Sequence, residues 1–212
     1  MKKILITLLF FCALGCQDQK STCVDNPEAI ENELCCCPPI IHLQPYNGFT
    51  VKEAQQVKKQ FADYLKKSLD YDEEIEIDPP IKLDTSMQNA ARTRYRADKI
   101  ISNQMKRTNT HNVIIGLLHE DISLTYKGHA DWGVLGLSFR GKNTCAVSTY
   151  RVKNKQRDLW KVVAHEFIHA YFNYGHCPKD DPHCIMKDAK GHANLAIQKD
   201  LCDYCKQKVP SV

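Results

Sequence analysis

HEFIHAYFNYGHC, residues 165–177, is the stretch that decides the fold expected for this chain of 212 residues. The run DLWKVVAHEFIHAYF, residues 158–172, has no proline or glycine and repeats apolar residues at helical intervals. His165 and His169 therefore lie one turn apart on one helix face, where both imidazoles can bind one metal ion. Glu166 stands beside that ion without binding it, where a carboxylate can accept a proton from water.

The residues after the helix strengthen this interpretation, because an isolated H-E-x-x-H also occurs by chance in unrelated helices. They are, in order, His176-Cys177, Cys184-Ile185-Met186 and Cys202-Asp203-Tyr204-Cys205. This order closely resembles the archaemetzincin family, whose pattern is H-E-x-x-H-x-x-G-x-x-H-C, followed by C-x-M and C-x-x-C. The resemblance extends over about residues 40–205 and includes STYR, residues 148–151, just before the helix.

The resemblance implies two zinc ions per chain. His165, His169 and His176 would bind a catalytic zinc, with Glu166 as the general base and Met186 in the Met-turn beneath the metal. Four cysteines would bind a structural zinc, namely Cys177, Cys184, Cys202 and Cys205. The ligand types agree with this division, because four thiolates close a tetrahedral site whereas three imidazoles leave one position for water. Taken alone, Met186 is equally consistent with ordinary core packing.

The sequence departs from the family pattern at the end of the helix. The family's glycine, three residues after the second histidine, is Phe172 here, but Asn173 follows, and asparagine adopts left-handed backbone more readily than most residues. Counting back from His176 restores the spacing, so we expect Asn173 to break the helix and Gly175 to let His176 reach the metal. The competing donors are expected to lie in a solvated loop: Asp180, Asp181 and His183.

Around this motif, strand and helix patterns alternate, which predicts a sheet domain of the α/β or α+β class with flanking helices. Strands are expected at 40–46, 73–78, 112–118, 133–140 and 143–152, and helices at 51–65 and 87–105. Thr50 and Glu53 form a capping box before the first helix. By resemblance the domain is metzincin-like, with a twisted mixed sheet, the zinc helix and a cysteine-rich, zinc-bound C-terminal subdomain.

A peptide or protein substrate is also implied by the resemblance. In metzincins the strand before the zinc helix lies at a sheet edge and pairs antiparallel with the peptide, so residues 143–151 are expected to form that edge. Hydrolysis of peptide bonds by a zinc-activated water is the first interpretation. The alternative is a catalytically silent, zinc-stabilised surface lipoprotein that binds peptides or partner proteins. Glu166 argues against this alternative, because a binding module needs no general base.

The N-terminus, MKKILITLLFFCALGC, has two lysines, an apolar run too short to span a bilayer, and small residues before a cysteine. Residues 1–15 are expected to be a signal peptide, and ALGC resembles a bacterial lipobox with Ala13 in place of the usual leucine. Cys16 is the expected lipidation site, in preference to plain secretion or an uncleaved anchor. Residues 16–39 would then form a polar tether and residues 40–212 the domain, held on a membrane of the bacterial cell envelope.

Eleven cysteines divide by position into groups with different roles. Outside the signal, the lipid candidate and the four zinc ligands, an odd set remains: Cys23, Cys35, Cys36, Cys37 and Cys145. At least one of these thiols lacks an intramolecular partner. Disulfides within the tether or to Cys145 are one interpretation of CCC at 35–37, and metal or thiol handling at the membrane is the other.

A formal net charge of +4 is spread along the chain, because lysine and arginine are scattered through stretches such as VKKQFADYLKK and ARTRYRADK. Such patterns are typical of solvated helix faces and do not build a stripe that attracts phosphates. We therefore expect no nucleic-acid partner. We also expect the protein to be a monomer.

Overall fold

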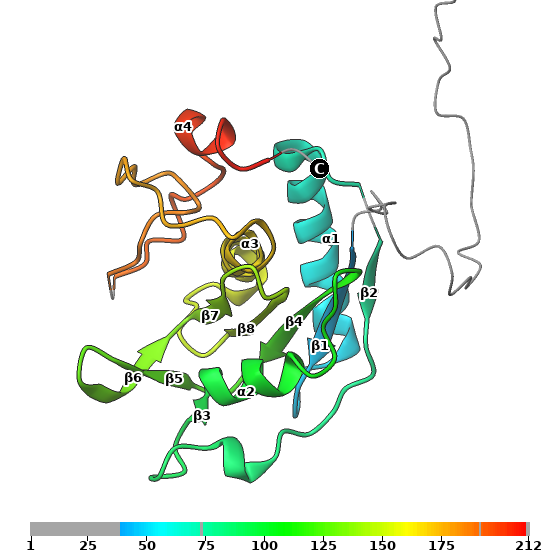
Figure 1. Ribbon diagram of the computed structural model, residues 1–212, viewed down its shortest axis with the longest axis vertical. Helices are drawn as coiled ribbons and strands as arrows, with labels where there is room; N and C mark the ends of the chain where they lie inside the picture. The colour runs from blue at the N-terminus through cyan, green and yellow to red at the C-terminus, as the bar shows by residue number, and fades with distance from the viewer. Residues whose placement is uncertain (1–38, 73, 191, 211–212) are drawn as a thin grey trace, which may run out of the picture. The chain divides into compact units, whose positions relative to one another are not determined.

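A mixed sheet of five strands organises the part of the chain that the computed structural model describes, residues 39–72, 74–190 and 192–210 (Figure 1). Its strands are β1 (Ile40–Pro45), β2 (Ile75–Ile77), β4 (Asn112–Leu118), β7 (Gly136–Phe139) and β8 (Thr144–Ser148). The strand order is β2-β1-β4-β8-β7, and only the β7–β8 pair within this sheet is antiparallel. The continuous apolar run of β4 reflects its central place, because a parallel strand is buried on both faces.

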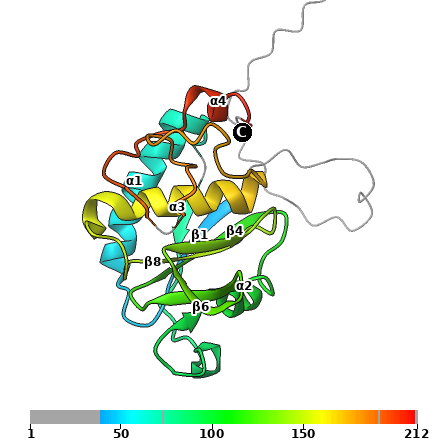
Figure 2. The ribbon, with the colours of Figure 1, turned by 90° about the vertical axis from the view of Figure 1, so that its left-hand side faces the viewer.

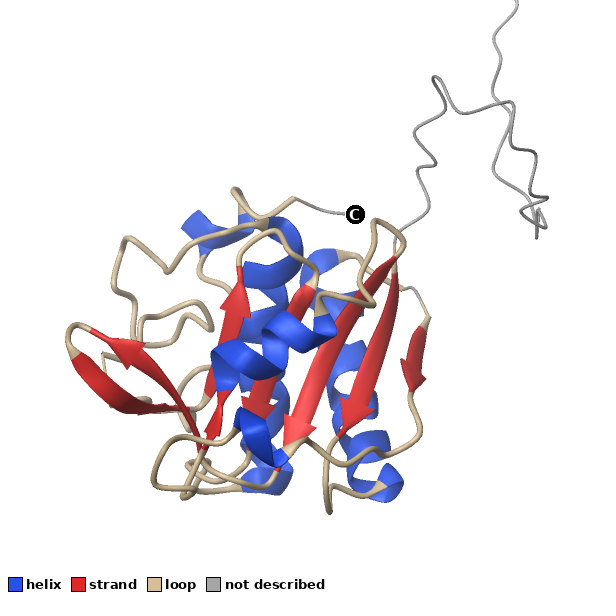
Figure 3. Ribbon diagram, turned by 60° about the horizontal axis from the view of Figure 1, so that its bottom comes forward, coloured by secondary structure: helices blue, strands red, loops and turns tan. Residues whose placement is uncertain are grey.

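Helices cover both faces of this sheet (Figure 3). α1 (Val51–Leu69) and α3 (Lys155–Phe172) pack on one face, and α2 (Ala97–Gln104) packs on the other. The alternation along β8 makes this visible. Cys145 and Val147 belong to the core shared with α1 and α3, whereas Ala146 between them belongs to the core shared with α2.

The two helices on the first face hold each other by buried aromatic contacts. α1 begins at the predicted capping box, in which the Glu53 backbone N–H donates to the Thr50 hydroxyl over 3.2 Å. Phe61 of α1 and Phe167 of α3 meet edge to face, with ring centroids 5.4 Å apart. Burying each of these side chains contributes about 1.5–3 kcal/mol, so the helix that carries the H-E-x-x-H motif is firmly seated.

A second, three-stranded sheet was not predicted. It has the order β3-β5-β6, where β3 is Tyr95–Arg96, β5 is Ile122–Tyr126 and β6 is His129–Val134. β5 and β6 form a hairpin that extends to the left of the main sheet in Figure 1 and faces the viewer in Figure 2. The chain passes directly from β6 into β7, so this hairpin leads into the edge of the five-stranded sheet.

The helix expected at 87–105 is wrong in its first half. A short 3₁₀ turn (Thr85–Met87) ends where the helix was expected to begin, and α2 does not start until Ala97. The side chain of Asn89 accepts hydrogen bonds from the backbone N–H groups of Thr93 and Arg94, and Arg92 has a positive φ of 53°. This local turn competes with helix, as asparagine side chains often do, and the chain then pairs with β5 before α2 starts.

The expected edge strand is also wrong. Residues 143–151 contain β8, but β8 lies between β4 and β7, so the edge is β7. A tight turn, in which the Lys142 N–H donates to the Phe139 carbonyl over 3.0 Å, returns the chain so that β8 pairs parallel with β4. The antiparallel strand before β8 is thereby left outside, where a partner chain can pair with it.

Predictions for residues 1–38, including the signal peptide, Cys16 and the CCC stretch, lie outside the described residues. Within residues 39–210, leaving out 73 and 191, no helix combines the length and the apolar character needed to cross a bilayer. A short helix, α4 (Asp203–Lys206), lies near the end of the described chain and carries Cys205.

Candidate metal centres

α3 brings the Nε2 atoms of the first two predicted metal ligands close together. The Nε2 atoms of His165 and His169 lie 3.1 Å apart, and the two rings are nearly perpendicular. Asn154 caps the start of the helix by accepting from the Arg157 N–H over 3.1 Å. His169 is buried and His165 is partly buried, so neither side chain is fully open to solvent.

Backbone carbonyls fix which nitrogen of each ring carries the proton. His165 Nδ1 lies 2.7 Å from the Ile185 carbonyl, and His169 Nδ1 lies 2.5 Å from the Tyr174 carbonyl. A carbonyl only accepts, so each Nδ1 is the donor and each neutral ring directs an Nε2 lone pair at the other. Burial lowers the pKa of His165, and it lowers the pKa of His169 to about 3, which keeps both rings neutral.

A metal ion bound by both Nε2 atoms would remove the repulsion between these two lone pairs. Two imidazole nitrogens at about 2.05 Å from one tetrahedral zinc are about 3.3 Å apart, close to the 3.1 Å observed. The hydrogen-bonded Nδ1 atoms have the arrangement that orients metal-binding histidines in general. The two rings therefore fit a zinc ion as ligands.

The end of α3 confirms the predicted helix break. Asn173 is the C-cap residue in the left-handed conformation, with φ 54° and ψ 21°. The chain then returns, so that the ring of His176 lies 5.3 Å from that of His165 and 4.8 Å from that of His169, centroid to centroid. One ligand atom from each of the three histidines lies within 4.8 Å of the others. Burial lowers the pKa of His176 too, so the third ring is also suited to bind as a neutral ligand.

The competing donors are engaged elsewhere in the loop. Asp180 pairs with Lys187 over 2.5 Å, and Asp181 accepts from the His183 backbone N–H over 2.8 Å. None of these three belongs to the group formed by the α3 histidines and His176. Asp188, which was not predicted, lies 3.8 Å from His176 Nδ1 and is the acidic neighbour of the third ring.

Glu166 is buried against the edge strand. A Cβ atom on Gly136 of β7 would lie 2.7 Å from Glu166 Cγ and 2.8 Å from its Oε1, so only glycine leaves room for this carboxylate. Burial raises the pKa of Glu166 to about 7, and a hydrogen bond with the Ser138 side chain opposes that rise in part. A carboxyl group with this pKa exchanges a proton readily near neutral pH.

Met186 is fully buried in a tight turn next to the histidines. The Lys187 N–H donates to the Cys184 carbonyl over 3.1 Å, which places Met186 at the third position of that turn. The preceding residue supplies the carbonyl that orients His165, and the Met186 carbonyl accepts from the Cys177 N–H over 2.8 Å. The turn therefore connects both candidate centres, and its role beneath a metal stays a prediction.

The four predicted cysteines converge. Their sulfur atoms all lie within 4.8 Å of one another: Cys177, Cys184, Cys202 and Cys205. Cys177 Sγ and Cys202 Sγ are 3.6 Å apart, far from the roughly 2.05 Å of a disulfide but near the roughly 3.8 Å of two sulfurs on one tetrahedral zinc. The four sulfurs therefore fit a closed tetrahedral site.

Donors around the sulfurs favour thiolates at part of this cluster. Burial raises the pKa of Cys177, but hydrogen bonds from the backbone N–H groups of Asp181 and Lys179 outweigh it, so the net shift is downward. Burial raises the pKa of Cys184 to about 11 despite the Cys202 N–H, which lies 3.4 Å from Cys184 Sγ. Burial also raises the pKa of Cys205. A divalent cation would offset this cost of charging buried sulfurs.

Sequence reasoning missed three residues that shape these centres. Gly136 and Ser138 adjoin Glu166 from β7, and Tyr174 connects the two centres through its carbonyl and its hydroxyl. The only signal for Gly136 is a glycine inside a strand pattern, which often marks a close approach of another group. Tyr174 gives no signal, because its contacts depend on how the chain folds back after Asn173.

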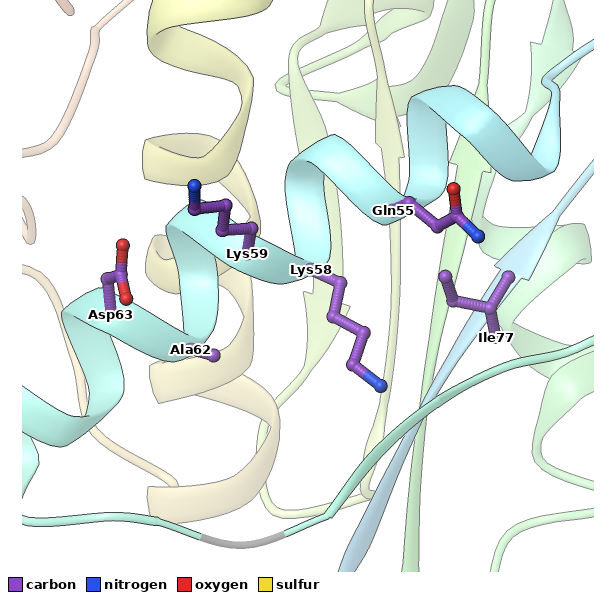
Figure 4. A pocket seen from close by; sticks show the side chains of 6 residues that line it. All are labelled: Gln55, Lys58, Lys59, Ala62, Asp63 and Ile77. Atoms are coloured by element: carbon purple, nitrogen blue, oxygen red, sulfur yellow. The ribbon is translucent and has the colours of Figure 1, made fainter.

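Two further features carry none of this chemistry. His42, Glu76 and Asp78 form a third group of possible ligands, but Asp78 also lies 3.9 Å from Arg107, and the group reads as an ordinary ion-pair cluster. A shallow hollow of about 450 Å³ lies between α1 and β2 (Figure 4). Its lining residues are Gln55, Lys58, Lys59, Ala62, Asp63 and Ile77, none of which is a candidate ligand.

A mixed sheet with an antiparallel edge strand, an H-E-x-x-H helix packed on it and a four-cysteine group together match the fold of archaemetzincins. Archaemetzincin from Methanopyrus kandleri has this fold, with a TM-score of 0.66 and 19% identity over 81% of this chain and 93% of that chain. Archaemetzincin from Archaeoglobus fulgidus, solved as a complex with malonate, matches with a TM-score of 0.62 and 20% identity over 80% of this chain and 99% of that chain. The expected archaemetzincin-like fold is therefore confirmed. No family model and no curated protein matches the sequence.

Proposed function

We propose that this protein is a zinc-dependent metallopeptidase that hydrolyses peptide bonds, with Glu166 as the general base. The observation that carries the proposal is the position of Glu166, buried against the edge strand β7 and next in sequence to His165. Its carboxylate adjoins the strand on which an extended peptide would lie. The raised pKa suits a group that accepts a proton in one step and releases it in the next.

The three histidines would hold the catalytic zinc, and the four cysteines would hold the structural one. A zinc ion held by the three imidazoles would act as a Lewis acid, which polarises a carbonyl and lowers the pKa of water. Glu166 takes the proton of the attacking water and passes it to the departing amine nitrogen. The carbonyls of Ile185 and Tyr174 hold the two α3 rings in one tautomer throughout, because each accepts from an Nδ1–H.

The substrate would be a peptide in extended form, bound along β7. An edge strand offers unpaired backbone groups, so a peptide can extend the sheet whatever its side chains are. β7 runs from Gly136, beside Glu166, towards Phe139. The turn that follows β7 contacts the C-terminal end of α3. A peptide that pairs antiparallel with β7 runs the opposite way, from the Phe139 end towards Gly136.

The competing function is a catalytically silent protein that binds peptides on the same strand. Substitution of Glu166→Gln separates the two, because glutamine keeps the size of the side chain but cannot take the proton. We expect the variant to retain both metal ions and to lose hydrolysis of a peptide library by at least about a hundredfold. Equal turnover by the variant and the parent would sink the proposed mechanism, and absence of turnover in the zinc-loaded parent would favour the silent binder.

We further propose that the mature protein is a monomeric lipoprotein of the bacterial cell envelope. The support is the sequence of residues 1–16, which ends in the lipobox-like ALGC. Acyl chains on Cys16 would hold the domain on the membrane, since each buried methylene contributes about 0.8 kcal/mol. Cys16→Ser should release the protein into the aqueous phase in detergent partitioning, and unchanged partitioning would refute the lipid anchor.

A further inference from the structure

The turn after the edge strand is fastened to the helix that carries the histidines. Arg140 and Gly141 occupy the two central positions of the turn from Phe139 to Lys142, and Gly141 has a positive φ of 63°. The N–H groups of Gly141 and Asn143 donate to the carbonyls of His169 and Ala170, each over 3.3 Å. These carbonyls belong to the last turn of α3, where no complete intrahelical ladder remains. The backbone of Arg140 is therefore held in a fixed place relative to His169.

The guanidinium of Arg140 lies against the chain that leads to the third histidine. A Cβ atom on Gly175 would lie 3.4 Å from Nη1, 3.6 Å from Nη2 and 3.7 Å from Cζ of Arg140. Three nearly equal distances indicate that the planar group presents its face to Gly175, which directly precedes His176. Its N–H groups lie in the plane of the guanidinium, so this packing leaves them available to a carboxylate.

Arg140 lacks the ion pair that most arginines of the described chain make. Within residues 39–72, 74–190 and 192–210, its guanidinium makes no hydrogen bond and no ion pair. Five other arginines each pair with an aspartate: Arg94, Arg96, Arg107, Arg151 and Arg157. The nearest acidic group of the third ring, Asp188, faces His176 instead. An exposed, unpaired cation is thus held beside three neutral imidazoles.

We propose that Arg140 binds a carboxylate side chain of the substrate on the N-terminal side of the scissile bond, which makes the enzyme prefer peptides with Asp or Glu there. The inference rests on the proposed peptidase function and names the substrate class of the same site. The direction follows from the sheet. A peptide antiparallel to β7 has its residues before the scissile bond at the Arg140 end and its C-terminal residues at the Gly136 end. The C-terminal carboxylate of the peptide substrate therefore does not meet this guanidinium, whereas an acidic side chain before the scissile bond does.

Cleavage of a peptide library tests the preference. We expect Asp and Glu to be enriched among the residues just before the cleaved bond with the parent, and the enrichment to vanish with Arg140→Gln. Lys142→Gln is the matched control, because it removes a positive charge from the same turn two residues away. For a Glu-containing peptide, kcat/KM should fall roughly threefold to tenfold in Arg140→Gln, with no change for its Gln analogue. Enrichment that is absent in the parent, or unchanged in Arg140→Gln, would overturn the inference.

A binding measurement separates this inference from the proposed hydrolysis. The probes are two fluorescent peptides of alternating alanine with either glutamate or glutamine, titrated into zinc-loaded Glu166→Gln protein. We expect the glutamate peptide to bind roughly threefold to tenfold more tightly, and the difference to disappear when Arg140→Gln is added. Equal affinities in the presence of Arg140 overturn the carboxylate subsite even where peptides are cleaved. A glutamate preference without cleavage by the parent supports the subsite and overturns only the peptidase. A loss of thermal stability in Arg140→Gln with the preference unchanged would instead assign Arg140 to the C-terminal end of α3, where a cation is favourable.

Discussion

The hydroxyl of Tyr174 donates to Sγ of Cys205 across 3.5 Å, while the carbonyl of the same tyrosine accepts from Nδ1 of His169. One residue therefore touches a ligand of each candidate metal centre. It stands directly after Asn173, where the left-handed turn sends the chain from α3 towards the cysteines. The adjacent ligands His176 and Cys177 repeat the connection, because neighbours in the chain point to different centres.

Tyr174→Phe should weaken the cysteine centre and leave the histidine centre intact. The substitution removes the O–H donor from Cys205 but keeps the backbone carbonyl that orients His169. Loss of a hydrogen bond to a metal ligand typically costs tenfold or more in affinity, so release of the thiolate zinc to a chelator should accelerate roughly tenfold. Tyr204→Phe is the control, since Tyr204 is exposed and lies beside Cys205 in the chain. Equal release by Tyr174→Phe and the parent would contradict the coupling.

Gly136→Ala should impair catalysis without removing metal. The added methyl group would lie 2.7 Å from Glu166 Cγ, closer than carbon atoms approach, so the buried carboxylate must move. A displacement of about 1 Å in a reacting group can cost roughly a hundredfold in rate, and we expect a loss of that order in kcat. Gly48→Ala is the matched control, because a Cβ there meets no heavy atom within 4 Å. Full activity in Gly136→Ala would show that Glu166 does not act from this position.

Glu166 should make the stability of the protein depend on pH once the histidine centre is emptied by a mild chelator. Its pKa rises from 4.5 to about 7 on burial, so the folded protein keeps a proton that the unfolded chain has already lost. This contribution is present below about pH 4.5 and is lost as the pH rises through 7. Glu166→Gln should therefore be about 3 kcal/mol more stable than the parent at pH 8, and less than about 1 kcal/mol more stable at pH 5. Urea unfolding at both pH values measures the difference, and parallel curves for the two proteins would contradict the buried carboxyl.

The parts of the fold that were predicted correctly are those that depend on neighbouring residues. The capping box at Thr50 and Glu53, the apolar run of β4 and the helix over 158–172 all rest on contacts within a few positions of the sequence. Asn173 belongs to the same group, because the left-handed preference is a property of the residue itself. The convergence of the cysteines was not predictable in this way and came from the resemblance to archaemetzincins.

The errors concern pairings between distant residues, or local turns that outweighed a pattern. Whether β7 or β8 lies at the edge depends on which strand β4 accepts, and the sequence of either strand is compatible with both places. The β5–β6 hairpin left one signal in the sequence, Gly128, because glycine suits the positive φ that a two-residue hairpin turn requires and that Lys127 and Gly128 both have. Apolar residues at helical spacing favoured a helix from residue 87, but the Asn89 turn prevailed. The place of Arg140 follows from the β7–β8 turn and from α3 together.

The left-handed conformation of Asn173 is the basis of a prediction about the third metal ligand. Asn173→Gly should preserve metal retention and activity, because glycine reaches φ 54° without steric cost. Asn173→Val should damage both, since a β-branched residue resists positive φ and would move His176 away from the other two rings. His176→Ala should release the catalytic zinc to a mild chelator at least about tenfold faster than the parent, with the thiolate zinc retained. His183→Ala and Asp181→Ala are matched controls from the same loop and should behave like the parent. If His176→Ala holds its metal while either control loses it, the third ligand is one of those two residues and the three-histidine centre is assigned wrongly.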